Sequence, residues 1–253
     1  MTSLGKYKLR ARAEHLKTIF FYFLNRKRLR AQENLRIPII INNFNRLNSL
    51  VDLISWLESA GYLNIIIIDN SSTYEPLLRY YAKSTYKVYR CNNLGPYAMW
   101  LLPELWNSVK NNFFVYTDSD VVPAEFCPKD VVGKIIDLHH RYPLLAKIGL
   151  SLKIDDLPDS YGKKNQVISW EKQYWENKIN DELYDAAIDT TFAVYKPRAK
   201  GGWWLSGART APPLSARHIP WYADEQNLSA EEVYYRNSSR KDFSTWVHSN
   251  GMI

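Results

Sequence analysis

The sequence predicts an α/β protein with a mostly parallel sheet flanked by helices and with a basic helical arm at its N-terminus. Short apolar runs rich in β-branched residues recur between residues 37 and 123, and stretches with helical spacing of apolar side chains separate them. This alternation is typical of consecutive strand–helix–strand units. The length of 253 residues, with 46% hydrophobic and 23% charged residues, suits one large domain or a domain with an appendage.

The elements of the first half follow in order along the chain. We expect strands at residues 37 to 44, 63 to 70, 86 to 90 and 113 to 123, with helices between them at residues 48 to 61, 76 to 84 and 97 to 109. Connections of this length indicate a doubly wound parallel arrangement. The pattern is less regular after Pro123, where we expect a helix at 129 to 142, a strand at 145 to 154 and helical residues at 171 to 176.

The arm, residues 1 to 36, carries the excess of positive charge behind the net charge of +7. Its cations are Lys6, Lys8, Arg10, Arg12, Lys17, Arg26, Lys27, Arg28, Arg30 and Arg36, against Glu14 and Glu33. The aromatic patch between them, residues 16 to 24, is far shorter than the about 20 apolar residues that cross a bilayer. Basic residues follow that patch where a secretory signal would have small residues at its cleavage site.

Two interpretations of the arm stay open. Residues 6 to 30 could lie on an anionic membrane surface, or form a helix packed on its own domain. A nucleic-acid partner is not expected, because the rest of the chain has no basic and aromatic stripe to continue the arm. Cys91 and Cys127 are the only cysteines, which fits a reducing compartment. We therefore expect a cytoplasmic protein, either free or peripheral on the cytoplasmic face of a membrane.

Two carboxylates, Asp118 and Asp120, follow the buried-looking residues 113 to 117. Ligands of open α/β sheets bind at the carboxyl ends of the strands, and alternate residues of an extended chain point the same way. The pair can therefore converge on one cation. A hard divalent metal that holds phosphate oxygens suits such a site.

Four polar motifs follow the four expected strands in order: Asn42-Asn43-Phe44-Asn45-Arg46, Ile68-Asp69-Asn70-Ser71-Ser72, Asn92-Asn93-Leu94-Gly95 and Asp118-Ser119-Asp120. In this order they resemble the GT-A glycosyltransferases of the family 2 group, over roughly residues 37 to 222. The resemblance implies a GT-A-like, Rossmann-like nucleotide-binding domain at 37 to 240. It divides into a nucleotide-binding half at 37 to 123 and an acceptor half at 124 to 240, and a tail follows at 241 to 253.

The resemblance also implies roles for particular residues. Nucleotide-sugar contacts fall to Asn43, Arg46, Asp69, Asn93, Gly95, Asp118 and Arg209. The arginine side chains can bind phosphate with two donors, and glycine lets the backbone approach a ligand closely. Asp120 would coordinate Mn²⁺ or Mg²⁺ on the diphosphate, and His218 is the candidate for a further metal ligand. The alternatives are a loop cap for Asp69, an ordinary turn residue for Asn93, a surface cation for Arg209 and a packed histidine for His218.

The catalytic base is less defined by the resemblance. Family 2 enzymes usually take it from a Glu-Asp pair after the metal-binding strand, and no such dipeptide follows Asp120. Asp189, which precedes an expected strand, is the best substitute, with Asp155, Asp156, Asp224 and Glu225 as rivals. We assign sugar contacts first to Trp203 and Trp204, since aromatic faces pack against sugars.

These residues together lead to an expected function. The chain would be a metal-dependent hexosyltransferase that moves a sugar, with inversion, from a UDP-sugar onto a glycan or lipid-linked acceptor in surface polysaccharide or glycoconjugate synthesis. Two alternatives remain: a nucleotidyltransferase acting on sugar phosphates, and a non-catalytic module that only binds nucleotide sugars. The missing Glu-Asp dipeptide favours the binding module. The absence of a glycine-rich loop after the first strand disfavours the nucleotidyltransferase.

Overall fold

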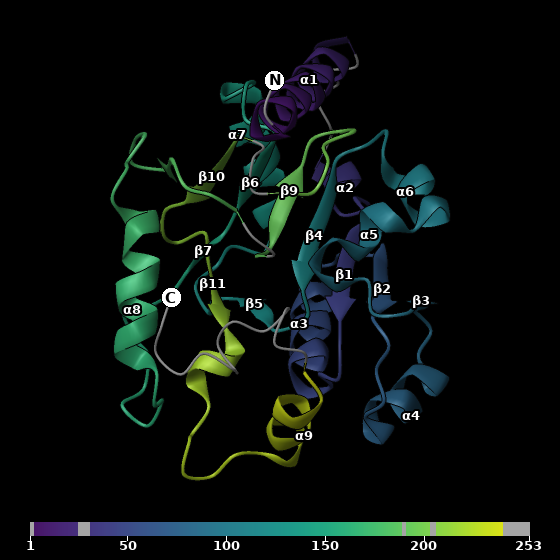
Figure 1. Ribbon diagram of the computed structural model, residues 1–253, viewed down its shortest axis with the longest axis vertical. Coiled ribbons are helices and arrows are strands. Elements are labelled where there is room, and N and C mark those ends of the chain that lie inside the picture. Colours follow the sequence, from purple (N-terminus) through teal and green to yellow (C-terminus); the bar gives the residue numbers. More distant parts are fainter. Residues whose placement is uncertain (1–2, 25–30, 189–190, 203–205, 240–253) are drawn as a thin grey trace.

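The computed structural model describes residues 3–24, 31–188, 191–202 and 206–239 (Figure 1). Within this part of the chain, the main sheet has the strand order β3-β2-β1-β4-β9-β6-β10-β8. The strands are β1 (Ile39–Asn43), β2 (Ile65–Asp69), β3 (Lys87–Arg90), β4 (Phe114–Asp118), β6 (Lys147–Gly149), β8 (Leu183–Tyr184), β9 (Ala193–Tyr195) and β10 (Gly207–Thr210). All of these except β8 and β9 run in the same direction. The mixed, mostly parallel α/β architecture is as expected, and it is consistent with a GT-A-like fold.

A second, three-stranded sheet has the order β5-β11-β7. Its strands are β5 (Val121–Pro123), β7 (Ser151–Leu152) and β11 (Ser215–His218). Helical elements are α1 (Ser3–Leu24), α2 (Ala31–Asn34), α3 (Asn48–Ser59), α4 (Glu75–Lys83), η1 (Gly95–Tyr97), α5 (Ala98–Leu101), α6 (Pro103–Val109), α7 (Val131–Arg141), α8 (Lys164–Lys172), η2 (Gln173–Trp175), η3 (Ile219–Tyr222) and α9 (Ala230–Ser238).

The side chains of β1 point alternately to the two faces of the main sheet, and a separate apolar core covers each face. Ile39 and Ile41 pack with the apolar faces of α3, α4 and α7, whereas Ile40 packs on the other side with residues of α5 and α6. Successive side chains of a strand point to opposite faces, so a continuous run of isoleucines buries both faces of the sheet. This two-sided burial fixes β1, with β4 beside it, at the centre of the sheet.

Three expected elements are divided in the structure. The helix expected at 97 to 109 breaks at Leu102, which is extended because it precedes Pro103. The strand expected at 113 to 123 ends at Asp118, and its last residues form β5 of the second sheet. The strand expected at 145 to 154 likewise contributes β6 to one sheet and β7 to the other. An apolar run predicts burial, but it does not say which sheet supplies the partner strand.

Helix α1 packs on the body of the protein at one end of its longest axis (Figure 1). The hydroxyl of Tyr22 contacts Nδ1 of His140 at 2.7 Å and donates to the carbonyl oxygen of His139 at 3.3 Å. The rings of Tyr22 and Phe113 meet edge to face, which places α1 near the residue that precedes β4. One face of the arm is thus packed on its own domain. In the described residues, no helix is both long and apolar enough to span a membrane.

Candidate functional site

The carboxyl ends of β1, β2 and β4 bring polar side chains to one edge of the main sheet. Asn43 pairs with Asp69 across β1 and β2, and Asn42 pairs with Asp118 across β1 and β4. Nδ2 of Asn42 donates to Oδ1 of Asp118 at 3.4 Å. Parallel neighbours end at the same edge, so motifs far apart in the sequence meet there. The structure places the first, second and fourth motifs together in this way.

The buried side chain of Asn43 connects two turns at this edge of the sheet. Its Nδ2 donates to the carbonyl oxygen of Arg46 at 2.9 Å and contacts the hydroxyl of Tyr81 at 2.7 Å. Its Oδ1 accepts from the hydroxyl of Ser119 at 2.6 Å. The Asn43 side chain therefore shapes the turn after β1 and ties it to the turn after β4. A nucleotide contact by its side chain stays a prediction.

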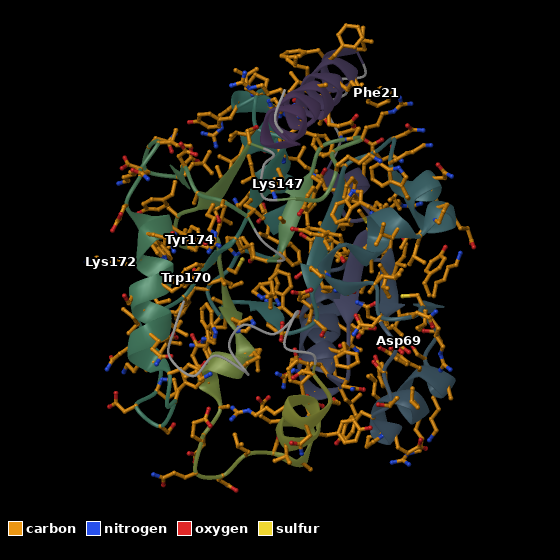
Figure 2. All side chains as sticks on the ribbon, in the orientation of Figure 1. Phe21, Asp69, Lys147, Trp170, Lys172 and Tyr174 are labelled. Carbon is orange, nitrogen blue, oxygen red and sulfur yellow. The ribbon has the colours of Figure 1, made fainter. Side chains whose placement is uncertain are left out.

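The end of β2 is connected to the turn that follows β3. Nδ2 of Asn70 donates to the carbonyl oxygen of Gly95 at 3.0 Å, and its Oδ1 accepts from the backbone N–H of Leu94 at 2.7 Å. Oδ1 of Asn93 accepts from the N–H of Gly95, whose φ of 73° favours glycine. Asp69, labelled in Figure 2, caps the following turn by accepting from the N–H of Ser72 at 3.0 Å. One carboxylate oxygen of Asp69 is therefore a loop cap, as the alternative expects.

Asp120 lies in the turn between β4 and β5, beside His218. Nε2 of His218 is 3.7 Å from Oδ1 of Asp120, and the N–H of Ile219 donates to the carbonyl oxygen of Asp120 at 2.8 Å. Pairing of His218 with Val121 in the second sheet holds the two segments together. His218 also packs against Trp221, with ring centroids 4.6 Å apart. His218 is therefore packed against Trp221, as the alternative expects, and it also lies close to Asp120.

Arg46 lies near the second carboxylate oxygen of Asp120. Its Nε is 3.9 Å from Oδ2 of Asp120, and its Nη1 forms a buried ion pair with Oε2 of Glu232. The guanidinium stacks on the ring of Tyr235, 3.6 Å from its centroid. Burial by itself would lower the pKa of Arg46, but the carboxylates of Asp120 and Glu232 raise it above its ordinary value. Arg46 is thus a permanent buried cation next to Asp120.

Helix α9 supplies carboxylates that the sequence did not identify as part of this region. Oε2 of Glu231 accepts from the backbone N–H groups of Leu47 at 2.7 Å and Asn48 at 2.9 Å, at the start of α3. Glu232 bonds both to Arg46 and to Arg236. The spacing of Ser229 and Glu232 is that of a capping box and predicts a helix start. It gives no sign that the glutamates reach β1 and α3.

Arg209 lies elsewhere on the sheet. Its strand, β10, is separated from β4 by β9 and β6. Nη1 of Arg209 pairs with Oε2 of Glu171 at 2.8 Å, and Nε donates to the carbonyl oxygen of Ala187 at 2.9 Å. The guanidinium also lies over the ring of Tyr174, which Figure 2 labels near α8. Within the described residues, no hydrogen bond or ion pair joins Arg209 to Asp120, and the diphosphate contact of Arg209 stays a prediction.

Asp189, Trp203 and Trp204 lie outside the described residues, but the segments around them are anchored. The first residue of β9, Ala193, pairs with Tyr116, so the chain enters β9 from the edge that carries Asp118. Lys147, labelled in Figure 2, is buried, and its Nζ donates to the carbonyl oxygens of Ile188 at 2.7 Å and Gly202 at 2.8 Å. One ammonium thus holds both segments.

Asp155, Asp156 and Glu225, three of the four rivals for the catalytic base, each form an ion pair with a basic side chain. Burial would raise the pKa of Asp156, but hydrogen bonds from Tyr222 and Arg217 outweigh it and lower that pKa. Two hydrogen bonds from Arg236 lower the pKa of Glu225. A carboxylate stabilised in this way accepts a proton less readily. Asp156 and Glu225 are consequently weaker candidates than sequence reasoning alone made them.

The spacing of Asp120 and His218 suits a pair of metal ligands. A carboxylate oxygen and an imidazole nitrogen 3.7 Å apart can bind one divalent cation, since each ligand atom lies about 2 Å from such an ion. In the described parts of the chain, no group of three or more histidine, cysteine or acidic side chains is arranged to hold a metal. The donor set therefore fits an ion that takes its remaining ligands from phosphate oxygens and water.

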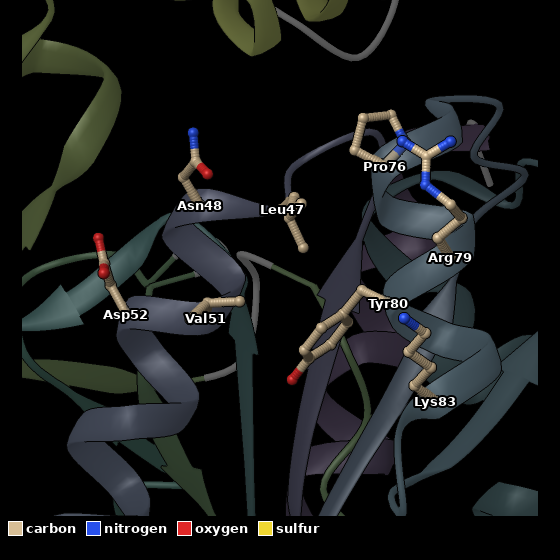
Figure 3. A pocket seen from close by; sticks show the side chains of 8 residues that line it. All are labelled: Leu47, Asn48, Val51, Asp52, Pro76, Arg79, Tyr80 and Lys83. Carbon is tan, nitrogen blue, oxygen red and sulfur yellow. The ribbon is translucent and has the colours of Figure 1, made fainter.

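Two cavities are lined in part by residues of α3. One of about 260 Å³ is lined by Arg46, Glu231 and Glu232 together with residues of η3 and of the loop before α9. A wider groove of about 600 Å³ lies between α3 and α4, where Figure 3 shows Val51 and Tyr80 between the two helices and Arg79 and Lys83 on α4. Asp69, Asp118 and Asp120 line neither cavity. The smaller cavity is the one in contact with Arg46.

Comparisons with known proteins give little further information. No protein-family model matches the chain, and no curated protein matches it. Among solved structures, the crystal structure of S. aureus TarS 1-349 has 14% sequence identity and a TM-score of 0.38, covering 64% of this chain and 47% of that one. A crystal structure of S. aureus TarS has 16% identity and a TM-score of 0.35, covering 51% of this chain and 24% of that one. The chain thus spans less than half of either neighbour, and overlap at this level carries no inference about activity.

Proposed function

We propose that the protein is a metal-dependent glycosyltransferase that uses a nucleotide sugar. The observation that carries the proposal is the pair formed by Asp120 and His218, 3.7 Å apart, at the sheet edge where Asn43, Asp69 and Asp118 also end. A divalent-metal ligand pair next to polar strand ends is suited to hold a nucleoside diphosphate. Arg46, buried and held by Glu232, would fix the position of the Asp120 carboxylate.

The reaction would break the bond between the anomeric carbon of the sugar and the diphosphate oxygen, and form a bond to an acceptor hydroxyl oxygen. Asp120 and His218 would hold Mn²⁺ or Mg²⁺. The bound ion would neutralise the negative charge that develops on the departing diphosphate. Asp118, Asp69, Asn93 and Gly95 are proposed to contact the nucleotide. Arg209 is retained in that group as a prediction, although its charge is matched by Glu171.

We assign the general base to Asp189. The acceptor hydroxyl would transfer its proton to this carboxylate as its oxygen attacks the anomeric carbon from the face opposite the leaving group, giving inversion. Support comes from the direction of β9, which begins at the Asp118 edge, and from the lowered pKa values of Asp156 and Glu225. Lys147 would act on the base indirectly, by holding the backbone at Ile188.

The donor is proposed to be a UDP-linked hexose, and the acceptor a glycan or a lipid-linked glycan of a surface polysaccharide or glycoconjugate. These choices rest on the sequence resemblance.

The test is nucleotide release from UDP-, GDP-, CMP- and dTDP-sugars, with and without Mn²⁺, by the wild type, Asp120→Asn and Asp181→Asn. Asp181 is the matched control, because its side chain is 97% exposed and pairs with Lys178 on the surface. We expect metal-dependent release of one nucleoside diphosphate by the wild type and by Asp181→Asn. Asp120→Asn should lose it, because the amide is a poor metal ligand.

Other outcomes would support a different function or reject the proposed metal site. Release of pyrophosphate from a nucleoside triphosphate and a sugar phosphate would identify a nucleotidyltransferase instead. Metal-dependent binding of a donor that is never cleaved, even with a panel of glycan acceptors, would identify a binding module. Donor cleavage unaffected by Asp120→Asn would reject the proposed metal site.

A further inference from the structure

Helix α1 exposes a row of large apolar side chains. Leu16, Phe20, Phe23 and Leu24 are 67%, 66%, 50% and 67% exposed. Their positions i, i+4, i+7 and i+8 put them on one face of the helix. We call these four residues the apolar stripe. Contiguous exposed apolar side chains, unlike scattered ones, are a feature of interaction surfaces.

The opposite face of α1 fixes the direction in which the stripe points. Thr18, Ile19 and Tyr22 are buried, and the Tyr22 hydroxyl bonds to residues of α7. The ammonium of Lys196 lies 4.2 Å from the centroid of the Tyr22 ring. Since this face is fixed to the domain, the stripe faces outward. Figure 2 shows Phe21, which adjoins the stripe, at the outer end of the molecule.

Cations border the stripe. Arg12 and Lys17 are exposed, one on each side of it by helical spacing. Arg198 lies over the ring of Phe21 at 4.0 Å and is also exposed. Glu14 pairs with Lys17 at 2.9 Å, but an exposed pair of this kind is weak and leaves the surface basic. The sequence adds Arg26, Lys27, Arg28 and Arg30 directly after the helix.

We propose that the apolar stripe docks the protein on the surface of a bilayer that contains anionic lipids. A helix with bulky apolar side chains on one face and basic residues beside them lies in the membrane interface, with the apolar face inserted and the cations at the headgroups. A second copy of this chain is a poorer partner, because two stripes in contact would bring Arg12 and Lys17 of both copies together. A bilayer surface offers the opposite charge.

This docking has a geometric consequence. In Figure 1, α1 lies at one end of the longest axis and α9, which contacts Arg46, lies toward the other. The carboxyl edge of the sheet would therefore face away from the bilayer. An acceptor anchored in the same membrane would have to extend past the sheet to reach Asp120. The docking itself does not depend on the proposed glycosyltransferase activity.

The test is cosedimentation with vesicles of phosphatidylcholine alone and of phosphatidylcholine mixed with phosphatidylglycerol. The stripe variant is Leu16→Ser combined with Phe20→Ser, two exposed positions whose replacement leaves the buried face intact. The matched control is Phe126→Ser, which removes a phenylalanine that is 82% exposed but lies outside α1. A third variant, Arg12→Glu with Lys17→Glu, tests the charge requirement.

We expect the wild type and Phe126→Ser to sediment with the mixed vesicles and to bind pure phosphatidylcholine weakly. The stripe variant should bind the mixed vesicles at least about tenfold more weakly, because it loses two large apolar groups. The charge variant should lose its preference for the anionic lipid. Circular dichroism should show that each variant remains folded.

Two results would overturn the proposal. One is equal vesicle binding by the wild type and the stripe variant, and the other is no binding by the wild type. If sedimentation velocity also shows a wild-type dimer that the stripe variant abolishes, the stripe is a contact between two copies. Neither result changes the outcome expected for nucleotide release, so failure here and failure of the proposed function can be told apart.

Discussion

Arg46 and Glu232, which are 186 positions apart in the sequence, form a buried ion pair next to Asp120. The same guanidinium lies 3.9 Å from the Asp120 carboxylate and stacks on the ring of Tyr235. Helix α9 is consequently fastened to the end of β1 by charge as well as by packing. The C-terminal part of the described chain thus helps to build the candidate site.

Breaking this ion pair should destabilise the protein strongly. Removing one partner of a buried pair leaves the other charge buried, which typically costs about 3–5 kcal/mol. Because Asp120 remains beside Arg46, we expect Glu232→Ala to lower the free energy of unfolding by about 3 kcal/mol in urea titrations. The control is Glu182→Ala, since Glu182 pairs with Arg141 at the surface and should contribute at most about 1 kcal/mol. Equal losses in the two variants would contradict the prediction.

Glu231 should stabilise the start of α3. Leu47, at the N-cap position, makes no side-chain cap, and Glu231 accepts from the first free N–H groups instead. We expect Glu231→Ala to cost about 1–2 kcal/mol of unfolding free energy. Glu231→Gln should cost less, because an amide oxygen still accepts a hydrogen bond but carries no charge. Urea titration of both variants measures the difference, and a more severe effect of the glutamine would argue against capping.

Lys147 should control the segments that flank Asp189. Its replacement by methionine leaves the carbonyl oxygens of Ile188 and Gly202 without this donor, at about 1–3 kcal/mol each. We expect faster hydrogen exchange around residues 188 to 202 and a lower kcat for donor cleavage. Lys196→Met is the matched control, because Lys196 is also buried but donates to Pro143. It should destabilise the fold without a comparable loss of kcat in the molecules that remain folded.

His218 should contribute to metal affinity. With Mn²⁺ and a nucleoside diphosphate present, His218→Ala should weaken Mn²⁺ binding at least about tenfold, as changes around metal sites commonly do. Electron paramagnetic resonance of free Mn²⁺ gives the affinity without any turnover. His15→Ala is a suitable control, since His15 lies on α1 near Ser206. Unchanged affinity in His218→Ala would favour a histidine that only packs against Trp221.

Stability should fall as the pH decreases below about 6.5. Burial, with a smaller effect of Lys196, lowers the pKa of His139 to about 3, so the folded protein keeps this ring neutral while the unfolded chain protonates it. The unfolded state then binds more protons, and stability decreases with falling pH by up to about 1.4 kcal/mol per unit. Burial also lowers the pKa of His15, which adds in the same direction.

Urea titrations between pH 7 and pH 4.5 would measure this slope. His139→Gln removes the titrating ring while keeping a side chain able to bond the carbonyl oxygen of Val194, which lies 3.0 Å from Nε2. The slope should become shallower in this variant. A slope identical to that of the wild type would show that other groups govern the acid sensitivity.

The sequence allowed the strand ends to be placed because their signal is local. The isoleucine runs of β1 and β2 bury both faces, and each ends in polar residues that the parallel register brings to one edge. The helix break at Pro103 was also readable in principle, since the residue before a proline avoids helical geometry. The division of residues 113 to 123 and 145 to 154 between two sheets was not, because each run is apolar along its length.

What the sequence determined by itself was the alternation of strands and helices, the identity of the polar strand ends and the basic character of the arm. These depend on residue type and on spacing over a few positions, which local geometry converts directly into exposure and direction. The tertiary structure alone decided that Glu231 and Glu232 reach α3 and Arg46, that Glu171 neutralises Arg209, and which face of α1 is exposed. Such contacts join segments distant along the chain, and they form only where packing brings opposite charges out of water together.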